Sequence, residues 1–208
     1  RGEEARQGAG AGKGHGLDGK SGVGINMPDK ETNMSIMLIP WMVFWIAAGV
    51  DGYIGSFASI GVCVLVPLLF HRNKKTWFDS LSGALAGGFS VAVLAGAPVR
   101  LILPLSYLAF GIMWTATCFR EIPITAYYSM NQYNGEDALR NPLFMKTNRI
   151  LTLMWGILYL MTPIWTYFLL GTPMASYTGA VNSVFPVVMG IFTVWFQKWY
   201  PAKIARGE

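Results

Sequence analysis

Histidine and cysteine are the side chains of this sequence best suited to hold a metal ion or a haem, and there are two of each. His15 and His71 fall in polar segments, whereas Cys63 and Cys118 lie in apolar stretches far from one another. The cysteine spacing fits neither a disulfide framework nor a metal site. A haem held between two histidines in a membrane needs imidazoles within apolar segments. The sequence therefore predicts no metal site and no cofactor.

Charged side chains avoid the middle of the apolar stretches. A retinal Schiff base would need a lysine there, and the proton or sodium relay of a coupled transporter would need an acidic residue. Asp79 comes closest, two residues into an apolar stretch and soon after Arg72, Lys74 and Lys75. We expect it to form a local ion pair or a charge at a helix N-terminus, rather than to be a functional carboxylate. No residue is predicted to be catalytic, which favours a protein that is not an enzyme.

Uncharged polar side chains are the remaining candidates. Asn182 is the most deeply placed of the strongly polar ones, and we expect it to form a hydrogen bond between helices. With Ser183, Thr115 and Thr117 it could instead line the pathway of a channel or small-solute transporter. Arg100 is expected to reach toward lipid headgroups, with anion binding as the alternative.

Composition places most of the chain in a lipid bilayer. Of its 208 residues, 53% are hydrophobic and 13% are charged, whereas a soluble domain carries about a quarter charged residues. The net charge is +5, but the basic residues flank apolar stretches and form no continuous stripe. This pattern is typical of a membrane protein and excludes nucleic acid as a partner.

Apolar stretches alternate with short polar joints along the chain, and we predict an all-α integral membrane bundle of about six transmembrane helices. The predicted spans are 35–50, 54–70, 77–97, 101–119, 150–170 and 177–197. The first two could be one long helix, but that helix would place Asp51 near mid-membrane, which is costly. Asp51-Gly52 is a strong turn signal and favours two helices.

The distribution of basic residues predicts the orientation. With six spans, fifteen Lys and Arg fall on one side of the bilayer and only Arg100 falls on the other. Positive joints face the cytoplasm. We therefore expect both the N-terminus and the C-terminus to be cytoplasmic, in the inner (plasma) membrane of a cell.

Three regions follow from this pattern: a glycine-rich segment at 1–34, a transmembrane helical domain at 35–200 and a short C-terminal tail at 201–208. The first region has too few large apolar side chains to fold, so we expect a flexible tail or linker. If it tethers a soluble domain, the chain would be a membrane anchor or subunit for a soluble or redox enzyme.

The third predicted span is rich in small residues. Gly83 and Gly87 form one small-x-x-x-small pair, and Ala84 and Gly88 form a second. Such pairs let helices approach closely. We expect contacts within the chain, with a homo-oligomer as the alternative.

Aromatic residues near the predicted span ends indicate interfacial belts, where such rings sit at the level of the headgroups. These residues are Trp41, Trp45, Trp77, Trp165, Trp195, Trp199 and Tyr200.

The longest predicted cytoplasmic connection runs over 120–149. Its first part is rich in tyrosine and its last part is basic, so it could bind a membrane-protein partner or anionic lipid. An ordinary connector is the simpler alternative. The candidate residues are Tyr127, Tyr128, Tyr133, Arg140, Lys146 and Arg149.

The order of these features resembles the intracellular septation protein A family of small bacterial inner-membrane proteins. The resemblance rests on IPWMVFW at 39–45, the basic joint after the second span, REIPI at 120–124, PLFMKTN at 142–148 and Trp155-Gly156. It implies a helical membrane protein in envelope maintenance or division, without an established catalytic site. The leading hypothesis is thus a non-enzymatic inner-membrane protein that acts through partner contacts, and the alternatives are a transporter or channel and a membrane anchor.

Overall fold

The computed structural model describes residues 34–70 and 76–207. The predictions for the 1–34 tail apart from Met34, for His15 and His71, and for the basic joint at 72–75 lie outside the described residues. Within the described ranges every element is helical and no strand occurs. The helices are α1 (Met34–Val50), α2 (Gly52–Leu69), α3 (Trp77–Leu94), α4 (Val99–Ala116), η1 (Thr117–Phe119), α5 (Ile124–Ser129), η2 (Met130–Tyr133), η3 (Gly135–Arg140), α6 (Pro142–Leu169), η4 (Ala175–Tyr177) and α7 (Thr178–Ala205).

Each of the six predicted apolar stretches is a helix. Five of them, α2, α3, α4, α6 and α7, are long and apolar enough to cross a membrane. The other, α1, has 17 residues. At about 1.5 Å per residue it is about 25 Å long, a little less than a hydrocarbon core of about 30 Å.

The predicted turn between the first two helices is present. The Asp51 carboxylate accepts a hydrogen bond of 2.9 Å from the Ile54 backbone N–H and so caps α2. The next turn brings Gly55 against α1, where an added Cβ would lie 2.2 Å from the backbone nitrogen of Ala48. Asp51 therefore begins α2 at the sharp corner, and Gly55 allows the two helices to pack closely.

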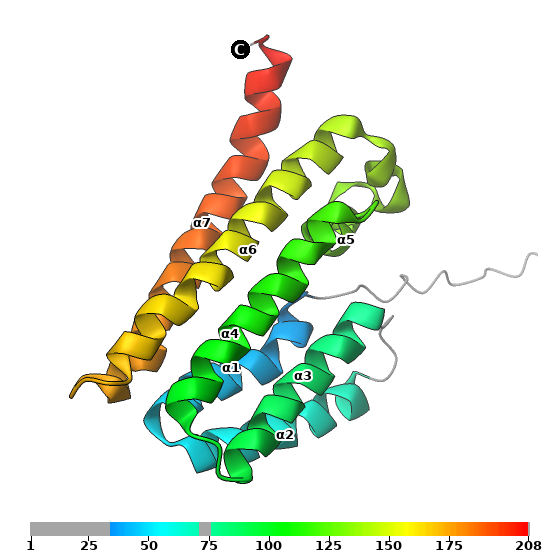
Figure 1. Ribbon diagram of the computed structural model, residues 1–208. Helices are drawn as coiled ribbons and strands as arrows, with labels where there is room; N and C mark the ends of the chain where they lie inside the picture. The colour runs from blue at the N-terminus through cyan, green and yellow to red at the C-terminus, as the bar shows by residue number, and fades with distance from the viewer. Residues whose placement is uncertain (1–33, 71–75, 208) are drawn as a thin grey trace, which may run out of the picture.

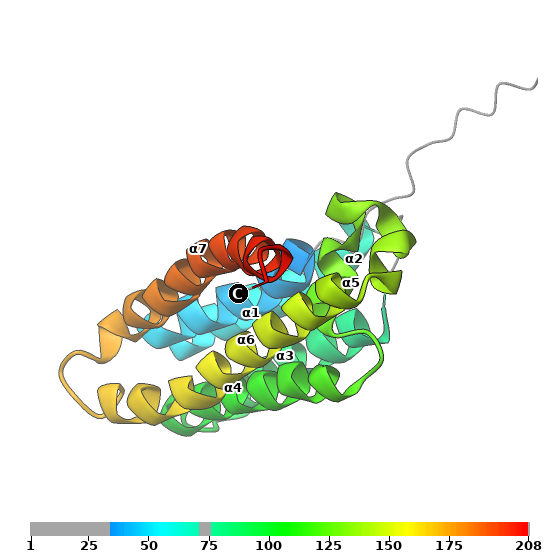
Figure 2. The ribbon, with the colours of Figure 1, turned by 90° about the horizontal axis from the view of Figure 1, so that it is seen from above.

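The bundle has two parts (Figure 1). The helices α4, α6 and α7 lie side by side, and α1, α2 and α3 pack beside them, with α1 in contact with α2, α3, α4 and α7. Seen from above, α1 lies between α7 and α3 (Figure 2). The short connections 51, 95–98 and 170–177 gather at one end, whereas α5, η2 and η3 lie at the other (Figure 1).

Stacked and edge-on aromatic rings fill the centre. Trp45 stacks on Tyr107 with ring centroids 4.2 Å apart, and Phe110 meets Tyr159 edge-on at 4.7 Å. Trp41 lies 5.0 Å from Phe110. These rings come from α1, α4 and α6, so they join the two parts of the bundle in one core.

The prediction of an interfacial belt was wrong for Trp41 and Trp45, which are 0% and 6% exposed. Trp41 Nε1–H donates to Ser82 Oγ at 2.7 Å, and Trp45 Nε1–H donates to Ser106 Oγ at 3.0 Å. An indole can be buried when its N–H finds a partner, and these serines provide it. Trp165 is half-buried, while Trp77, Trp195 and Trp199 are exposed.

The two small-residue pairs of α3 lie in different surroundings. Ala84 and Gly88 are exposed, and no described atom lies within 4 Å of a Cβ built on Gly88. Gly83 and Gly87 are half-buried beside Cys63, whose thiol donates to the Gly83 carbonyl at 3.6 Å. The buried positions of α3 are Phe78, Ser82, Ala86, Ser90 and Val93. Among them, the Ser82 hydroxyl accepts a hydrogen bond from the Trp41 indole of α1.

Glycines of other helices allow the close approaches. A Cβ on Gly111 of α4 would lie 2.8 Å from the Leu160 nitrogen, and one on Gly156 of α6 would lie 2.1 Å from Thr115 Oγ1. Gly179 of α7 sits equally close to α1, where its Cβ would lie 2.9 Å from the Ile46 carbonyl oxygen. Close packing through small residues, which holds membrane bundles together, thus occurs at α4–α6 and α1–α7.

Three boundaries differ from the sequence prediction. Arg100 lies in the first turn of α4, and Lys146 and Arg149 lie in the first turns of α6, not in connections. The helix α7 continues to Ala205, so most of the predicted 201–208 tail is helical. Pro201 lies inside α7 and does not end the helix.

The glycine contacts predict opposite outcomes for matched substitutions. Gly111→Ala should lower the free energy of unfolding in detergent by roughly 1–3 kcal/mol, since the methyl group meets the α6 backbone. Gly88→Ala should be neutral or stabilising, because its Cβ meets open space and alanine favours helix. Thermal unfolding of the two purified variants measures the difference. Equal melting temperatures would contradict the close α4–α6 approach.

Candidate functional site

Asp79 is positioned by the first turn of α3. Its backbone N–H donates to Thr76 Oγ1 at 3.0 Å, while its Oδ2 accepts hydrogen bonds from the Thr76 backbone N–H at 2.7 Å and from the Thr76 hydroxyl at 2.9 Å. This reciprocal arrangement is a capping box. Asp79 is thus the helix N-terminal charge that the sequence suggested, and the ion-pair alternative concerns 72–75, outside the described residues.

The other carboxylate oxygen of Asp79 reaches a second element. The Tyr128 hydroxyl of α5 donates to Asp79 Oδ1, and the same hydroxyl lies 3.5 Å from the sulfur of Met37 in α1. Burial raises the pKa of Tyr128, and the hydrogen bond to the Asp79 carboxylate raises it further. The phenol therefore remains a donor at alkaline pH, and it links the 120–149 connection to α3 and α1.

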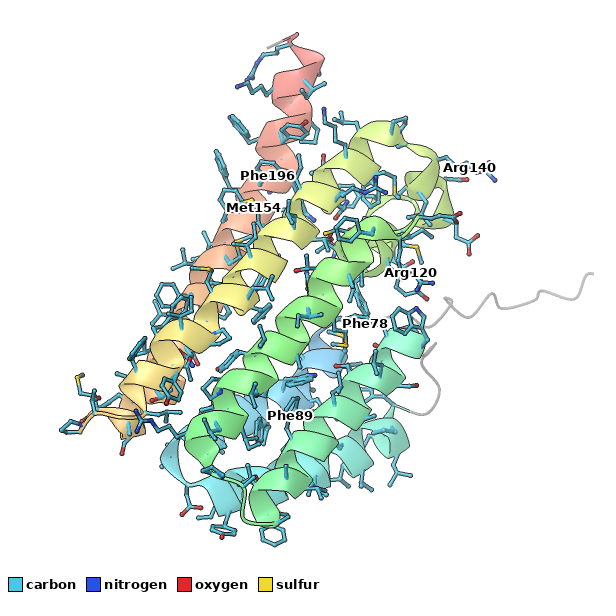
Figure 3. All side chains as sticks on the ribbon, in the orientation of Figure 1. Phe78, Phe89, Arg120, Arg140, Met154 and Phe196 are labelled. Atoms are coloured by element: carbon cyan, nitrogen blue, oxygen red, sulfur yellow. The ribbon has the colours of Figure 1, made fainter. Side chains whose placement is uncertain are left out.

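A cavity of about 290 Å³ lies beside this link, between the start of α3 and the end of α4. Its walls are largely aromatic and aliphatic, and Arg120 is the charged side chain among them. The Arg120 guanidinium carbon lies 4.9 Å from the centroid of the Trp77 ring, a cation–π contact. Figure 3 shows Phe78 and Arg120 at this end of the bundle. The lining residues are Thr76, Trp77, Phe78, Thr117, Arg120, Ile122, Ile124, Tyr127 and Tyr128.

Buried hydroxyls and an amide fix the 120–149 connection on α6. Thr125 Oγ1 donates to the Asn148 carbonyl at 2.7 Å and lies 2.7 Å from Thr152 Oγ1. Ser129 Oγ donates to Asn148 Oδ1 at 3.2 Å. Arg149 donates to the carbonyl of Arg120 at 3.3 Å. The connection is therefore a folded cap, which we define as residues 120–141, and no periodicity in this segment predicted such a fold.

The candidate partner residues fall into two groups on this cap. Tyr127 and Tyr128 are half-buried against the cavity, whereas Tyr133 and Arg140 are exposed. Arg140 makes a 3.9 Å ion pair with Asp137, one turn earlier on η3. Lys146 and Arg149, on the adjoining turns of α6, are exposed as well.

Asn182 lies in a different part of the bundle and forms hydrogen bonds between helices. Its Oδ1 accepts from Trp165 Nε1–H at 2.9 Å, and its amide N–H donates to Thr166 Oγ1 at 2.9 Å. Ser183 donates to the Gly179 carbonyl of its own helix. These groups tie α6 to α7 near the end opposite the cap.

The residues considered for a pathway are not gathered in one place. Thr115 faces Gly156, whereas Asn182 faces Thr166, which is more than two turns further along α6. The buried Thr115 hydroxyl has no hydrogen-bond partner among the described residues, and Thr117 donates to the Trp114 carbonyl at 2.7 Å. The candidates thus form separate contacts along the bundle.

Arg100 packs across the far end of the bundle. Its guanidinium carbon lies 4.9 Å from the Tyr167 ring centroid, and its Nη2 would lie 2.5 Å from a Cβ on Gly171. The side chain is exposed overall. Arg100 therefore joins the start of α4 to the end of α6 by a cation–π contact that the sequence spacing could not predict.

Comparison with known proteins gave no match among family models, curated proteins or solved structures.

Loss of the Tyr128 hydroxyl should detach the cap from α3. Tyr128→Phe should lower the free energy of unfolding by roughly 1.5–3 kcal/mol, the range for a hydrogen bond to a charged group. Tyr133→Phe is the control, because Tyr133 is 42% exposed and its ring packs on Phe144. Thermal unfolding in detergent at neutral pH checks the pair of variants.

The pH dependence of this difference follows from the raised pKa of Tyr128. The contribution is complete below the ordinary tyrosine pKa of about 10 and is lost as the pH rises further. The stability gap between the parent and Tyr128→Phe should therefore shrink above about pH 10. A gap that is constant with pH, or absent at neutral pH, would contradict the Asp79–Tyr128 link.

Proposed function

We propose that this chain is a non-enzymatic, multi-pass protein of the bacterial inner membrane, which acts through partner contacts of its cap. It crosses the bilayer six times in this proposal, with both termini on the cytoplasmic side. Five helices of sufficient length and hydropathy support the membrane location. The sixth span is α1, whose 17 residues pack against α2 and whose slight shortness the bilayer can accommodate.

Charge supports this orientation in the described residues. The end of the bundle that carries the cap and the α7 C-terminus has many basic side chains, while the other end has Arg100. The bias follows the positive-inside rule. The basic residues at the cap end are Arg120, Arg140, Lys146, Arg149, Lys198, Lys203 and Arg206.

The single observation that carries the functional proposal is the rigid presentation of polar side chains on the cap. Buried bonds such as Thr125–Asn148 and Tyr128–Asp79 hold the backbone, while Tyr133 and Arg140 remain exposed. An ordered surface loses less entropy on binding than a flexible connector does. The resemblance to the septation protein family supports placing the partner in envelope maintenance or division.

Transport receives less support. Asn182 bonds to side chains of α6 and Ser183 to its own helix, and Thr115 is more than two turns away from them. Between those levels the centre holds packed rings such as Tyr159, which meets Phe110 edge-on. A pathway would have to displace this packing.

The orientation can be tested with single cysteines in a background of Cys63→Ser and Cys118→Ser. Thr172→Cys lies in the short connection before α7, and Gln132→Cys lies on the cap, where the native side chain is exposed. A membrane-impermeant maleimide should label position 172 in intact spheroplasts and position 132 only after permeabilisation. Labelling of both positions in intact spheroplasts would overturn the orientation.

Photo-crosslinking in cells can test the partner surface. A benzophenone amino acid at Tyr133 should give a protein adduct of defined mass, because this exposed ring stands on the cap. The same probe at Val187 is the control, since this exposed side chain of α7 is expected to face lipid. Adducts at Val187 alone, or at neither position while the protein is inserted in the membrane, would contradict the proposed partner surface.

A further inference from the structure

The cavity at the start of α3 holds a positive charge that no carboxylate of the described residues neutralises. Arg120 lines it and is exposed. In the ranges 34–70 and 76–207 no carboxylate oxygen lies within 4.0 Å of its guanidinium. The guanidinium contacts the face of Trp77, and this contact leaves its edge and its N–H donors available.

Asp79, which accepts hydrogen bonds from two residues of the cavity wall, does not compete for this charge. One oxygen of Asp79 accepts two hydrogen bonds from Thr76, and the other accepts the Tyr128 hydroxyl. Both oxygens are therefore engaged by donors of the helix cap and of α5. The charge left in the cavity is complementary to an anion.

The rest of the cavity is suited to hydrocarbon. Trp77, Phe78, Ile122 and Ile124 supply most of its wall. Trp77, in the cavity wall, is 54% exposed, and Phe119, the residue before Arg120 in the chain, is 89% exposed. A tryptophan and a phenylalanine exposed at the end of membrane-length helices are typical of the boundary between headgroups and acyl chains.

We propose that this cavity binds an anionic phospholipid, with the lipid phosphate on Arg120 and the first acyl carbons along Trp77 and Ile122. The inference rests on the proposed membrane location. A planar guanidinium binds phosphate through two parallel hydrogen bonds, and its stacking on Trp77 orients it in advance. A soluble anion would gain nothing from the apolar wall, which favours a lipid as the occupant.

Lipid retention on the purified full chain tests the proposal. The protein is extracted from membranes, transferred to mild detergent and titrated with phosphatidylglycerol or with phosphatidylcholine of the same acyl chains. Native mass spectrometry then counts the bound lipids. The parent should retain one phosphatidylglycerol at least about fivefold better than phosphatidylcholine, the scale of one basic residue at a lipid surface.

Variants of Arg120 and Arg140 distinguish lipid binding in this cavity from a general attraction of anionic lipid to the basic surface. Arg120→Gln should remove the preference for phosphatidylglycerol, and Arg120→Lys should keep part of it because the charge stays while the fork is lost. Arg140→Gln is the matched control: this arginine is exposed on the cap and pairs with Asp137. It should retain the parental preference. Equal melting temperatures of the variants confirm that they fold alike.

Three results would overturn the proposal. One is equal binding of the two lipids by the parent, and another is an equal loss in Arg120→Gln and Arg140→Gln. The third is displacement of the lipid by millimolar inorganic phosphate, which would assign the site to a soluble anion. Recovery of the protein without detergent in the aqueous fraction would reject the membrane proposal itself, whereas protein that stays in the membrane but shows no preference would reject only this site.

Discussion

The close crossing of α4 and α6 is the constraint on which the rest of the structure depends. Gly111 and Gly156 leave no room for a side chain between the two backbones, and the helices share the most extensive contact in the bundle. Because α6 begins at Pro142 and extends past the end of α4, its first turns form a platform. The cap folds on this platform, and the cavity beside Arg120 exists because the cap returns over the start of α3.

Polar groups in the interior obey a second constraint, which is that an apolar surrounding offers no water to satisfy them. Many hydroxyls of the bundle donate to the carbonyl four residues earlier, as Thr162, Thr166 and Ser183 do. Others accept from indole nitrogens, as Ser82, Ser106 and Thr193 do. This pairing accounts for Trp41, Trp45 and Trp155, whereas the buried Nε1–H of Trp114 has no hydrogen-bond partner among the described residues.

The hydrogen bonds therefore have different roles at the two ends of the bundle. Around Asn182, the polar contacts join α6 to α7. At the cap, the buried contacts of Thr125 and Asn148 hold a backbone whose outer side chains stay exposed. Arg120 is both held and available: Trp77 orients its guanidinium, and no described acid neutralises its charge. The functional proposals accordingly concern the cap end of the bundle.

The amino-acid sequence by itself determined what depends on local pattern. Apolar stretches bounded by charge predicted the six helices to within a few residues at most ends, and Asp51-Gly52 predicted the corner between α1 and α2. Position in the chain also suggested that Asp79 begins a helix, because an acid at the first turn is stabilised there. These features require only neighbours along the chain.

Tertiary structure alone decided which faces of the helices meet. The glycine pairs of α3 have the same spacing as a packing motif, yet Gly111, Gly156 and Gly179 make the close contacts, since the choice depends on the partner helix. By its sequence position Trp41 could lie at the membrane interface or in the core. It lies in the core, where Ser82 of α3 accepts a hydrogen bond from its indole N–H. The pairing of Asp79 with Tyr128 and of Trp77 with Arg120 joins residues more than forty positions apart. No local pattern encodes such contacts, because they depend on how the helices are arranged in space.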